Sequence, residues 1–458
     1  MSFSLFGCIG LIACALAEEP VEADVPLTPL EQGRQYLAEK NLPLAKAAFE
    51  DCLSSANPKS LTYSDCQWEM GWALWLEEDW RGVIDSWEAS AEIHPTRENL
   101  DRYLQQARDN IGIEELLAIG RDSAATSYKS TVPAGTTVRL RAVGDMMIGS
   151  DFPSGYLNPD VDNTFSAVKE WLTDADITFG NLEGPLCDTG KTTKCKPDAP
   201  AGSCYAFRSP SRYIDIFKGA GFDVMSTANN HAGDFGEVCR KQTEQTLDKA
   251  AIAHTGRPGD IASLEQNGLK IAVIAFYTGR SGHYLNDHES AAQLVRALDT
   301  THDIVIVSFH GGAEGSKALH VPYGKETFYG ENRGHLREFT HTVIDAGADL
   351  VWGHGPHVLR GMEIYKNRLI AYSLGNFATY GRFNTRGQQG LGVVLETVIN
   401  AEGAFVSGQI FPTKQIARGV PSQDAEKKAI DVVRMLSAED FPETGVLVAQ
   451  DGTLSQSK

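Results

Sequence analysis

The sequence predicts an α/β domain whose sheets are covered on both faces, preceded by a small all-α region. From about residue 137 onward, short and nearly continuous apolar segments alternate with helical segments, which is typical of strands buried on both faces. Residues 29 to 120 are instead rich in Ala, Leu, Glu and Trp and contain few β-branched runs, a composition that favours helices. At 458 residues the chain exceeds one ordinary hydrophobic core, so we expect two folded domains.

The N-terminal segment 1–17 resembles a secretory signal, an apolar stretch too short to span a bilayer permanently. Two cleavage sites compete. The run Leu11-Ile12-Ala13-Cys14 resembles a lipoprotein box in which Cys14 is lipidated, and Ala15-Leu16-Ala17 resembles an ordinary signal-peptidase site. In both cases we expect export to the periplasm or cell surface, with membrane contact only through a lipid anchor at Cys14. The acidic segment 18–28 would form a tether.

Six cysteines lie beyond this signal, and an even number in an exported chain favours disulfides. Cys52 with Cys66 is the expected local pair. The pairing within the second group stays open among its four members, which are Cys187, Cys195, Cys204 and Cys239. A zinc site is the alternative for this group, but no CxxC spacing favours it.

The helical region, residues 29–120, contains two similar parts. Gly33 is followed by Phe49 and Gly71 by Trp87, so the glycine and the aromatic residue recur at one constant offset. This pattern resembles tetratricopeptide repeats, whose period is about 34 residues, and a generic bundle of helical hairpins is the alternative. We expect the region to bind a protein partner, and the Ser/Thr/Gly-rich residues 121–136 to form a linker.

The α/β domain follows as strands and helices in alternation. Each expected strand is a short apolar run bounded by glycine or polar residues. The strands are residues 137–143, 177–180, 224–228, 271–276, 304–309, 350–353, 368–372, 392–398 and 404–410. The helices are residues 164–173, 213–220, 237–251, 291–298 and 337–346. Residues 414–458 are expected to form a C-terminal tail.

Five polar clusters stand at the ends of these strands. Ligands bind outside the carboxyl ends of strands in such folds, so we expect the clusters to form one site. Carboxylates mixed with imidazoles suit Mn, Zn or Fe(II), ions that activate water or bind phosphate. The clusters are Val143-Gly144-Asp145, Gly180-Asn181-Leu182-Glu183, Asn229-Asn230-His231, Phe309-His310-Gly311-Gly312 and Gly353-His354-Gly355-Pro356-His357.

Each cluster alone also has an ordinary structural interpretation. Asp145 could cap a turn, Glu183 could be a solvated loop residue, and His310 could be a hydrogen-bonded structural histidine. The pair His354 and His357, separated by a glycine and a proline, is hard to explain by packing. The conjunction of five clusters therefore favours a metal site.

The third cluster also predicts proton transfer. His231 is placed to donate a proton to a leaving oxygen, and Asp234 could orient its ring; an Asn-rich turn would explain neither residue. The nearest cations for holding a phosphate or carboxylate are Arg208, Lys317 and Arg360, for which the alternative is an ordinary surface position.

Six motifs together resemble the CapA-type poly-γ-glutamate capsule synthesis proteins, in that family's order and across about residues 137–413. The motifs are Gly144-Asp145-Met146-Met147, Asn181-Leu182-Glu183-Gly184-Pro185, Asn229-Asn230-His231-Ala232-Gly233-Asp234-Phe235-Gly236, His310-Gly311-Gly312-Ala313-Glu314, Gly353-His354-Gly355-Pro356-His357-Val358 and Tyr372-Ser373-Leu374-Gly375-Asn376-Phe377. The helical N-terminal region lies outside this resemblance.

That family is similar to the calcineurin-like metallophosphoesterases. The resemblance implies a four-layer sandwich of two mixed sheets flanked by helices, with one or two divalent ions. It implies His231 as the residue that protonates the leaving group, with Asp234 beside it. The implied metal ligands are Asp145, Glu183 (where a bridging aspartate would stand), Asn230, His310, His354 and His357.

Two departures from the phosphoesterase pattern bear on the metal count. Met147 occupies the position of a first-strand histidine, and Pro356 is an extra residue in the closing Gly-His-x-His motif. A thioether is a poor ligand for a hard dication, so one of two metal positions is expected to be weakened or empty.

The expected function is that of an exported cell-envelope protein of capsule or poly-γ-glutamate synthesis or anchoring, whose metal site binds or acts on an anionic polymer. The alternatives are a periplasmic metal-dependent phosphoesterase with a small phosphate-containing substrate, and a non-catalytic polymer-binding scaffold. The net charge of −19 argues against a nucleic-acid partner, because phosphate backbones are bound by clustered Lys and Arg.

Overall fold

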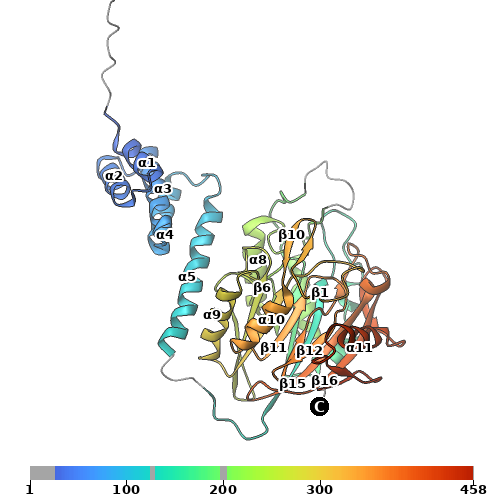
Figure 1. Cartoon of the computed structure of the whole chain (residues 1–458). Coiled ribbons are helices and arrows are strands. Elements are labelled where there is room, and N and C mark those ends of the chain that lie inside the picture. Colours follow the sequence, from blue (N-terminus) through green and yellow to red (C-terminus); the bar gives the residue numbers. More distant parts are fainter. Residues whose placement is uncertain (1–25, 124–128, 196–203, 457–458) are drawn as a thin grey trace, which may run out of the picture. The chain divides into compact units, whose positions relative to one another are not determined.

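A computed structural model describes residues 26–123, 129–195 and 204–456, the side chains of 119–123 excepted. The expected signal segment, with Cys14 and both cleavage sites, lies outside the described residues. The chain divides into two compact units, one ending at Leu100 and one beginning at Asp101 (Figure 1). Across the described ranges, no helix combines the length and apolarity that a membrane crossing requires.

The first unit is built from two helical hairpins. Their helices are α1 (Pro29–Ala38), α2 (Leu42–Ser55), α3 (Leu61–Leu76) and α4 (Trp80–Ile93). A disulfide joins Cys52 of α2 to Cys66 of α3, which confirms the expected local pair.

Both hairpins use the same packing. A Cβ at Gly33 would lie 2.3 Å from the Phe49 ring, and a Cβ at Gly71 would lie 2.1 Å from the Trp87 ring. The turns repeat as well, because Asn41 caps α2 and Asp79 caps α4 through a side-chain oxygen, at the same offset as the glycines. The close approach of the helices therefore explains the repeated glycine and aromatic residue, while assignment to the tetratricopeptide class stays a prediction.

Helix α5 (Leu100–Ser123) belongs to the second unit. Its residues Ile113, Leu116 and Leu117 pack into a hydrophobic cluster with the strands and helices of the sheet domain. The division therefore falls after Leu100 and not near residue 120, because the apolar side chains of α5 are buried by the domain that follows.

The second unit contains two large sheets. The described residues form a ten-stranded sheet in the order β18-β19-β16-β15-β1-β2-β3-β4, with β14 paired to β1 and β17 to β16. Its strands are β1 (Thr137–Met147), β2 (Ile177–Leu182), β3 (Val224–Ser226), β4 (Ala253–Thr255), β14 (Asn376–Thr379), β15 (Leu391–Asn400), β16 (Phe405–Ile416), β17 (Val420–Gln423), β18 (Leu447–Val448) and β19 (Thr453–Ser455).

The other large sheet has seven strands, in the order β12-β13-β11-β8-β6-β5, with β7 paired to β6. Its strands are β5 (Ala262–Gln266), β6 (Leu269–Tyr277), β7 (His283–Tyr284), β8 (Ile304–His310), β11 (Leu350–His354), β12 (Met362–Tyr365) and β13 (Arg368–Ala371). A separate hairpin is formed by β9 (Glu326–Phe328) and β10 (Glu331–Gly334).

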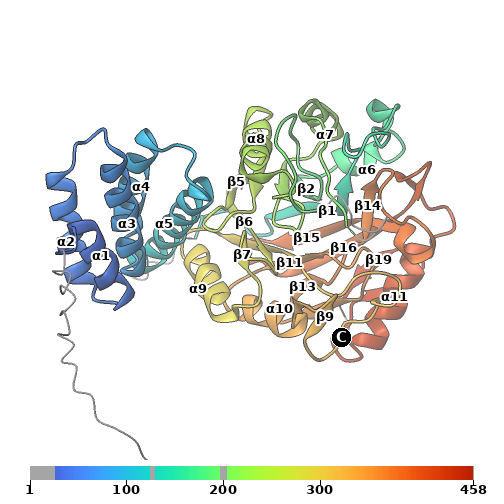
Figure 2. The same cartoon turned by 90° about the horizontal axis from the view of Figure 1, so that it is seen from above.

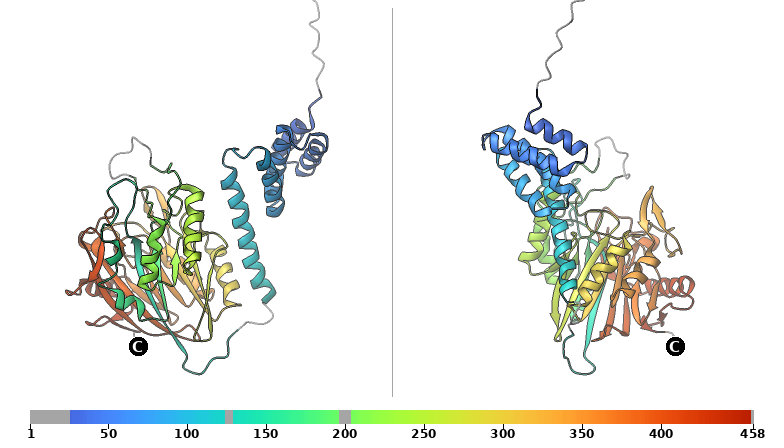
Figure 3. Two further views of the ribbon diagram at one scale, coloured as in Figure 1. Left: turned by 180° about the vertical axis from the view of Figure 1, so that it is seen from behind. Right: turned by 60° about the vertical axis from the view of Figure 1, so that its left-hand side comes forward.

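The two sheets stack face to face and are covered by helices outside. In β6, Ile271 and Val273 face the core between the sheets, whereas Ala272 and Ile274 face the outer cluster with α9 and α10. Figure 2 shows α7 and α8 on one side of the strands and α9 and α10 on the other, and Figure 3 shows the same layers from behind and from the side. This architecture confirms the expected four-layer α/β sandwich. Its helices are α6 (Lys169–Thr173), α7 (Ile214–Ala220), α8 (Gly236–Lys249), α9 (His288–Asp299) and α10 (Leu336–Asp345).

The C-terminal residues are part of the sandwich and not a separate tail. β17, β18 and β19 extend the ten-stranded sheet, and α11 (Lys428–Asp440) places Ala429, Val433 and Leu436 in the core between the sheets. These apolar side chains cover one end of the sandwich, which is why the segment folds onto it.

Two predicted elements are shorter than expected. The helix expected over 164–173 is α6, which begins only at Lys169 after a short helical turn, Val161–Asn163. The strand expected over 224–228 ends at Ser226, because the next residues turn into the Asn229-Asn230-His231 loop.

Candidate metal centre

The site lies where neighbouring strands of both sheets end. Asp145 at the end of β1 stands opposite Asn181 of β2, and His310 at the end of β8 stands opposite His354 of β11. Gly144 is required for this approach, since a Cβ there would lie 1.9 Å from the carbonyl oxygen of Gly375. Strand ends thus bring together side chains that are far apart in the sequence.

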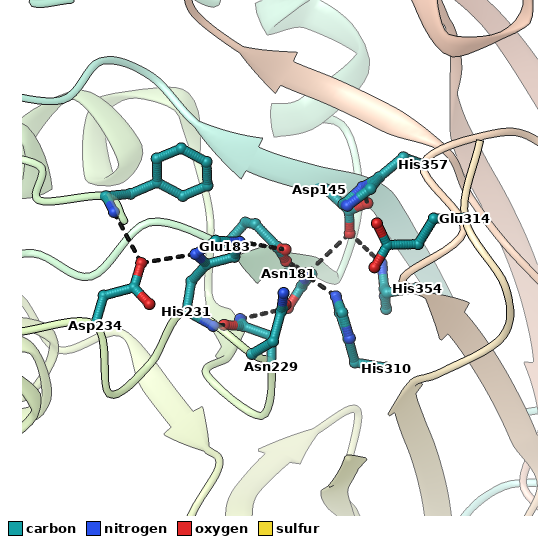
Figure 4. A network of polar contacts seen from close by, with 12 residues as sticks. Asp145, Asn181, Glu183, Asn229, His231, Asp234, His310, Glu314, His354 and His357 are labelled. Atoms are coloured by element: carbon teal, nitrogen blue, oxygen red, sulfur yellow. Dashed lines mark hydrogen bonds and ion pairs between the residues drawn. The ribbon is translucent and has the colours of Figure 1, made fainter. Parts of the chain in front are cut away.

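The Asp145 carboxylate faces two imidazoles. His357 donates from Nδ1 to Asp145 Oδ2 at 2.8 Å, and His354 Nδ1 lies 3.5 Å from Oδ1 (Figure 4). Burial raises the pKa of Asp145, but the contacts from His354 and His357 outweigh burial and hold the pKa well below its ordinary value. The same contact with Asp145 outweighs burial at His357 and raises its pKa to about 9.

Glu183 faces a third imidazole. Its Oε2 lies 3.3 Å from His310 Nε2, and both side chains are completely buried. Burial raises the pKa of Glu183, but the electrostatic contact with the His310 ring outweighs burial and lowers it to about 2. Ligand atoms of Asp145, Glu183 and His310 all lie within 4.8 Å of one another, so this group could hold a metal ion.

Several atoms of the predicted metal ligands lack hydrogen-bond partners, although they are buried. Buried polar atoms in folded proteins are nearly always paired, and each exception needs a reason. The unpaired atoms are Glu183 Oε1, Asn230 Oδ1 and both ring nitrogens of His310 and of His354. Buried carboxylate, amide and imidazole atoms without hydrogen-bond partners suit a divalent cation, so these side chains agree with the expected cofactor.

Next to this group, the His231 ring is fixed by a buried carboxylate. His231 donates from Nδ1 to Asp234 Oδ2 at 2.7 Å, and the Phe207 N–H donates to the same oxygen at 2.8 Å. Lys194 Nζ binds the other oxygen, Asp234 Oδ1, at 2.5 Å. With Nδ1 occupied, His231 Nε2 is left 3.9 Å from Glu183 Oε1, on the side of the metal group.

Disulfides hold the segment that carries these contacts. Cys195–Cys204 links the residue after Lys194 to the segment that leads to Phe207, and Cys187–Cys239 ties the same region to α8. These pairs resolve the connectivity that the sequence leaves open. The segment that brings Lys194 and Phe207 to Asp234 is therefore anchored by two disulfides.

Two further residues of the site were not among the predicted ligands. Asn181 donates from Nδ2 to both Asp145 Oδ1 (2.8 Å) and Glu183 Oε2 (2.7 Å), so it bridges the two carboxylates. Asn229 donates to Asn181 Oδ1 and accepts from the His231 N–H, and so connects the two halves of the site. The signal for Asn181 is its position two residues before Glu183, which places both on one face of a strand.

The two departures from the phosphoesterase pattern have structural consequences. Met147 is buried and packs against Gly184, where a Cβ would lie 2.5 Å from Met147 Cγ, so this position supplies no ligand. Pro356 is absorbed by a tight turn with Gly355 at φ 109° and His357 at φ 57°. A non-glycine residue in that left-handed region is unusual and clusters at functional sites. The turn keeps His354 and His357 on the same carboxylate.

The three predicted cations have different surroundings. Arg360, for which a surface position was the alternative, is completely buried and binds Glu326 with two N–H groups at 2.9 and 2.7 Å. Arg208 pairs with Asp151 at 2.8 Å, and Lys317 is exposed. None of the three is among the residues lining the cavity beside the site, which has a volume of about 450 Å³. Its cations are Lys194, Arg333 and Arg382.

Comparison with known proteins gives the chain a family. Residues 139–380, more than half of the 458 residues, match the family described as bacterial capsule synthesis protein PGA_cap. The chain is 27% identical over 260 residues to the capsule biosynthesis protein CapA of Bacillus anthracis, covering 52% of this chain and 59% of that protein. It is 28% identical over 252 residues to the PGA biosynthesis protein CapA of Bacillus subtilis, covering 51% and 61%.

A third relative is a probable polyglutamine synthesis accessory protein of Mycobacterium tuberculosis, 27% identical over 231 residues that cover 44% of this chain and 56% of that protein. All three matches leave more than a third of the relative's own length uncovered. The matched residues nevertheless contain each of the strand-end clusters described above, from Asp145 to His357. The chain therefore belongs to the PGA_cap family of bacterial capsule synthesis proteins.

Proposed function

We propose that this protein is an exported cell-envelope component of capsule-polymer synthesis or anchoring, and that it binds an anionic polymer at a divalent-metal centre. The observation that carries the proposal is the set of buried, unpaired ligand atoms around Glu183, His310 and His354. The names of the relatives, which refer to capsule, PGA and polyglutamine synthesis, support the polymer as the ligand class.

The metal would be held by oxygens and imidazoles that the strand ends supply. The proposed ligands are Asp145, Glu183, Asn230, His310, His354 and His357. Such an ion, Mn, Zn or Fe(II), polarises a carbonyl or phosphoryl oxygen and lowers the pKa of bound water. Because Met147 contributes no ligand and the described residues contain one acid–imidazole group, we propose a single ion.

The residues around the ion suit a hydrolytic step as well as binding. Asp234 accepts the Nδ1 proton of His231, so the proton on Nε2 of the imidazolium form faces the metal group and could be given to a leaving oxygen or nitrogen. This geometry favours a second candidate function, a metal-dependent hydrolase with His231 as general acid. Among such hydrolases, the sequence predicts a metal-dependent phosphoesterase.

The test is metal analysis of the purified full chain beside Asp145→Ala and His354→Ala. We expect about one equivalent of Mn, Zn or Fe in the wild type and at least a tenfold lower metal affinity in each variant, because both lose a ligand from the first coordination sphere. Equal metal content in all three proteins would refute the assignment. Hydrolysis of a generic phosphodiester that His231→Ala abolishes would favour the second function.

A further inference from the structure

A group of arginines beside the metal-site cavity is held by aromatic rings and not by carboxylates. The Arg382 guanidinium lies 4.9 Å from the centre of the Tyr156 ring and 5.1 Å from that of Tyr205. The Arg418 guanidinium lies 5.5 Å from the centre of the same Tyr156 ring and 5.3 Å from that of Tyr380. Stacking on a ring orients a guanidinium without neutralising its charge.

Several arginines elsewhere in the domain are neutralised by carboxylates. Arg141, Arg257 and Arg360 are each paired with a carboxylate at 2.6 to 2.7 Å. Across the part of the chain that the structure describes, Arg382, Arg386 and Arg418 have no such ion pair, and Arg382 Nε is buried without a hydrogen-bond partner. A protein with a net charge of −19 has left these three cations uncompensated in one place.

Arg386 and Arg418 line a hollow that adjoins the metal-site cavity. The hollow has a volume of about 330 Å³, and its lining includes Arg386 and Arg418 but no carboxylate. It shares Phe383 and Asn384 with the cavity that reaches His231 and His357, and Arg382 lines that cavity. Both spaces are thus connected by the loop that follows β14.

We propose that Arg382, Arg386 and Arg418 form a second anion-binding subsite, so that the ligand of the metal centre is a linear polyanion and not a single small anion. One charged unit reaches the metal group while neighbouring units lie along the arginines. This inference rests on the proposed function, because it extends the ligand of the same centre. Guanidinium groups suit it, since they bind carboxylates and phosphates alike through paired N–H groups.

The test compares binding of long and short anions to the metal-loaded full chain. The variant replaces all three arginines (Arg382→Gln, Arg386→Gln, Arg418→Gln), and the control removes three exposed charges on outer helices (Lys218→Gln, Lys249→Gln, Arg296→Gln). The probes are labelled long-chain polyglutamate, polyphosphate of similar length, and a labelled diglutamate. Fluorescence anisotropy is measured over a range of salt concentrations.

We expect the triple arginine variant to bind a long chain about tenfold or more weakly, with a shallower salt dependence, because charge-assisted contacts are lost. Metal content should not change, diglutamate binding should weaken much less than long-chain binding, and the control should match the wild type. If the substitutions weaken binding of only one of the two long chains, the charged groups of that chain, carboxylates or phosphates, are those of the ligand. Equal long-chain affinity in variant and wild type would overturn the subsite. A wild type that binds no long chain would instead refute the proposed polymer function itself.

Discussion

The metal centre and the Arg360–Glu326 pair are both buried charged groups near the end of β8, yet they differ in how their polar atoms are used. Arg360 donates to both oxygens of Glu326 and to the carbonyls of Ala313 and Ala318. Glu326 also accepts the Ala313 N–H, so the pair is saturated with partners. At the metal centre, by contrast, the imidazoles of His310 and His354 have no hydrogen-bond partner at all.

This difference separates a structural ion pair from a ligand site. Removing charges from water costs several kcal/mol for each ion, and only complete pairing recovers that cost. The saturated pair fixes the loop after β8 and leaves nothing for a ligand to bind. The unsaturated group is unfavourable in the protein alone, and an added cation would supply the missing partner. The following substitutions test whether the two groups differ as this argument requires.

The largest effect is expected from Arg360→Met. The change leaves the Glu326 carboxylate buried without its partner, which costs about 3–5 kcal/mol of unfolding free energy. Urea denaturation followed by circular dichroism would measure it. The double variant Arg360→Met/Glu326→Leu should recover most of the loss, because it removes both charges together. A single variant as stable as the wild type would show that this pair is not the structural element described.

A buried histidine outside the metal centre sharpens the same comparison. His283 donates from Nδ1 to the Ala275 carbonyl at 3.1 Å and accepts the Gly259 N–H on Nε2 at 2.7 Å, so its neutral form is fully paired. Burial lowers its pKa to about 4. The unfolded chain, with a pKa of about 6.5, binds the proton more tightly, so stability is full above that pH and is lost as pH falls towards 4.

Between pH 7 and pH 5 this loss should amount to about 2 kcal/mol. The glutamine in His283→Gln does not titrate. The fall in unfolding free energy from pH 7 to pH 5 should therefore be smaller in this variant than in the wild type, by about 2 kcal/mol. Denaturation curves at both pH values for both proteins measure the difference, and other titrating groups cancel in it. Parallel pH dependence of the two proteins would contradict the assignment of His283 as a structural histidine.

Much of this organisation could be predicted from the sequence. The strands of the sandwich core are continuous apolar runs such as residues 304–309, so their existence follows from pattern alone. Convergence of Asp145, His310 and His354 follows from the rule that ligand sites form at strand ends. Strands β18 and β19 have only two and three residues, too few to show a pattern, so the sequence predicts a tail where the C-terminal segment in fact extends the sheet.

The remaining features depend on contacts between segments that no local pattern connects. Arg360 lies in an irregular stretch between two strands and pairs with Glu326, so no pattern in the neighbouring sequence indicates that its side chain is buried. Lys194 reaches Asp234 because a disulfide fixes its neighbour Cys195. Asn181 bridges two carboxylates only because β1 and β2 pair in one particular register. Tertiary register, more than residue type, decides these roles.

The smallest change in stability is expected at the metal centre itself. In Glu183→Gln the amide oxygen still accepts from Asn181 and the desolvation cost of the charge disappears together with its contact to His310, so the metal-free unfolding free energy should fall by less than in Arg360→Met. Metal binding should be nearly abolished. The wild type should gain about 2.7 kcal/mol at a metal concentration a hundred times its dissociation constant, and the variant should gain almost nothing.

The matched control is Glu314→Gln, since this carboxylate lines the same cavity but is paired with Arg333 at 3.0 Å. Thermal unfolding with and without Mn or Zn measures both variants. If Glu183→Gln keeps the full metal response, Glu183 is not a ligand, and its unpaired oxygen needs another explanation. If Glu314→Gln also loses the stabilisation by metal, an ion pair with an arginine does not distinguish a structural carboxylate from a metal ligand at this site. If only Glu183→Gln loses the metal response, the binding site is marked by buried polar atoms that lack hydrogen-bond partners. Burial of a charged group would then not be enough to identify a metal ligand in this fold.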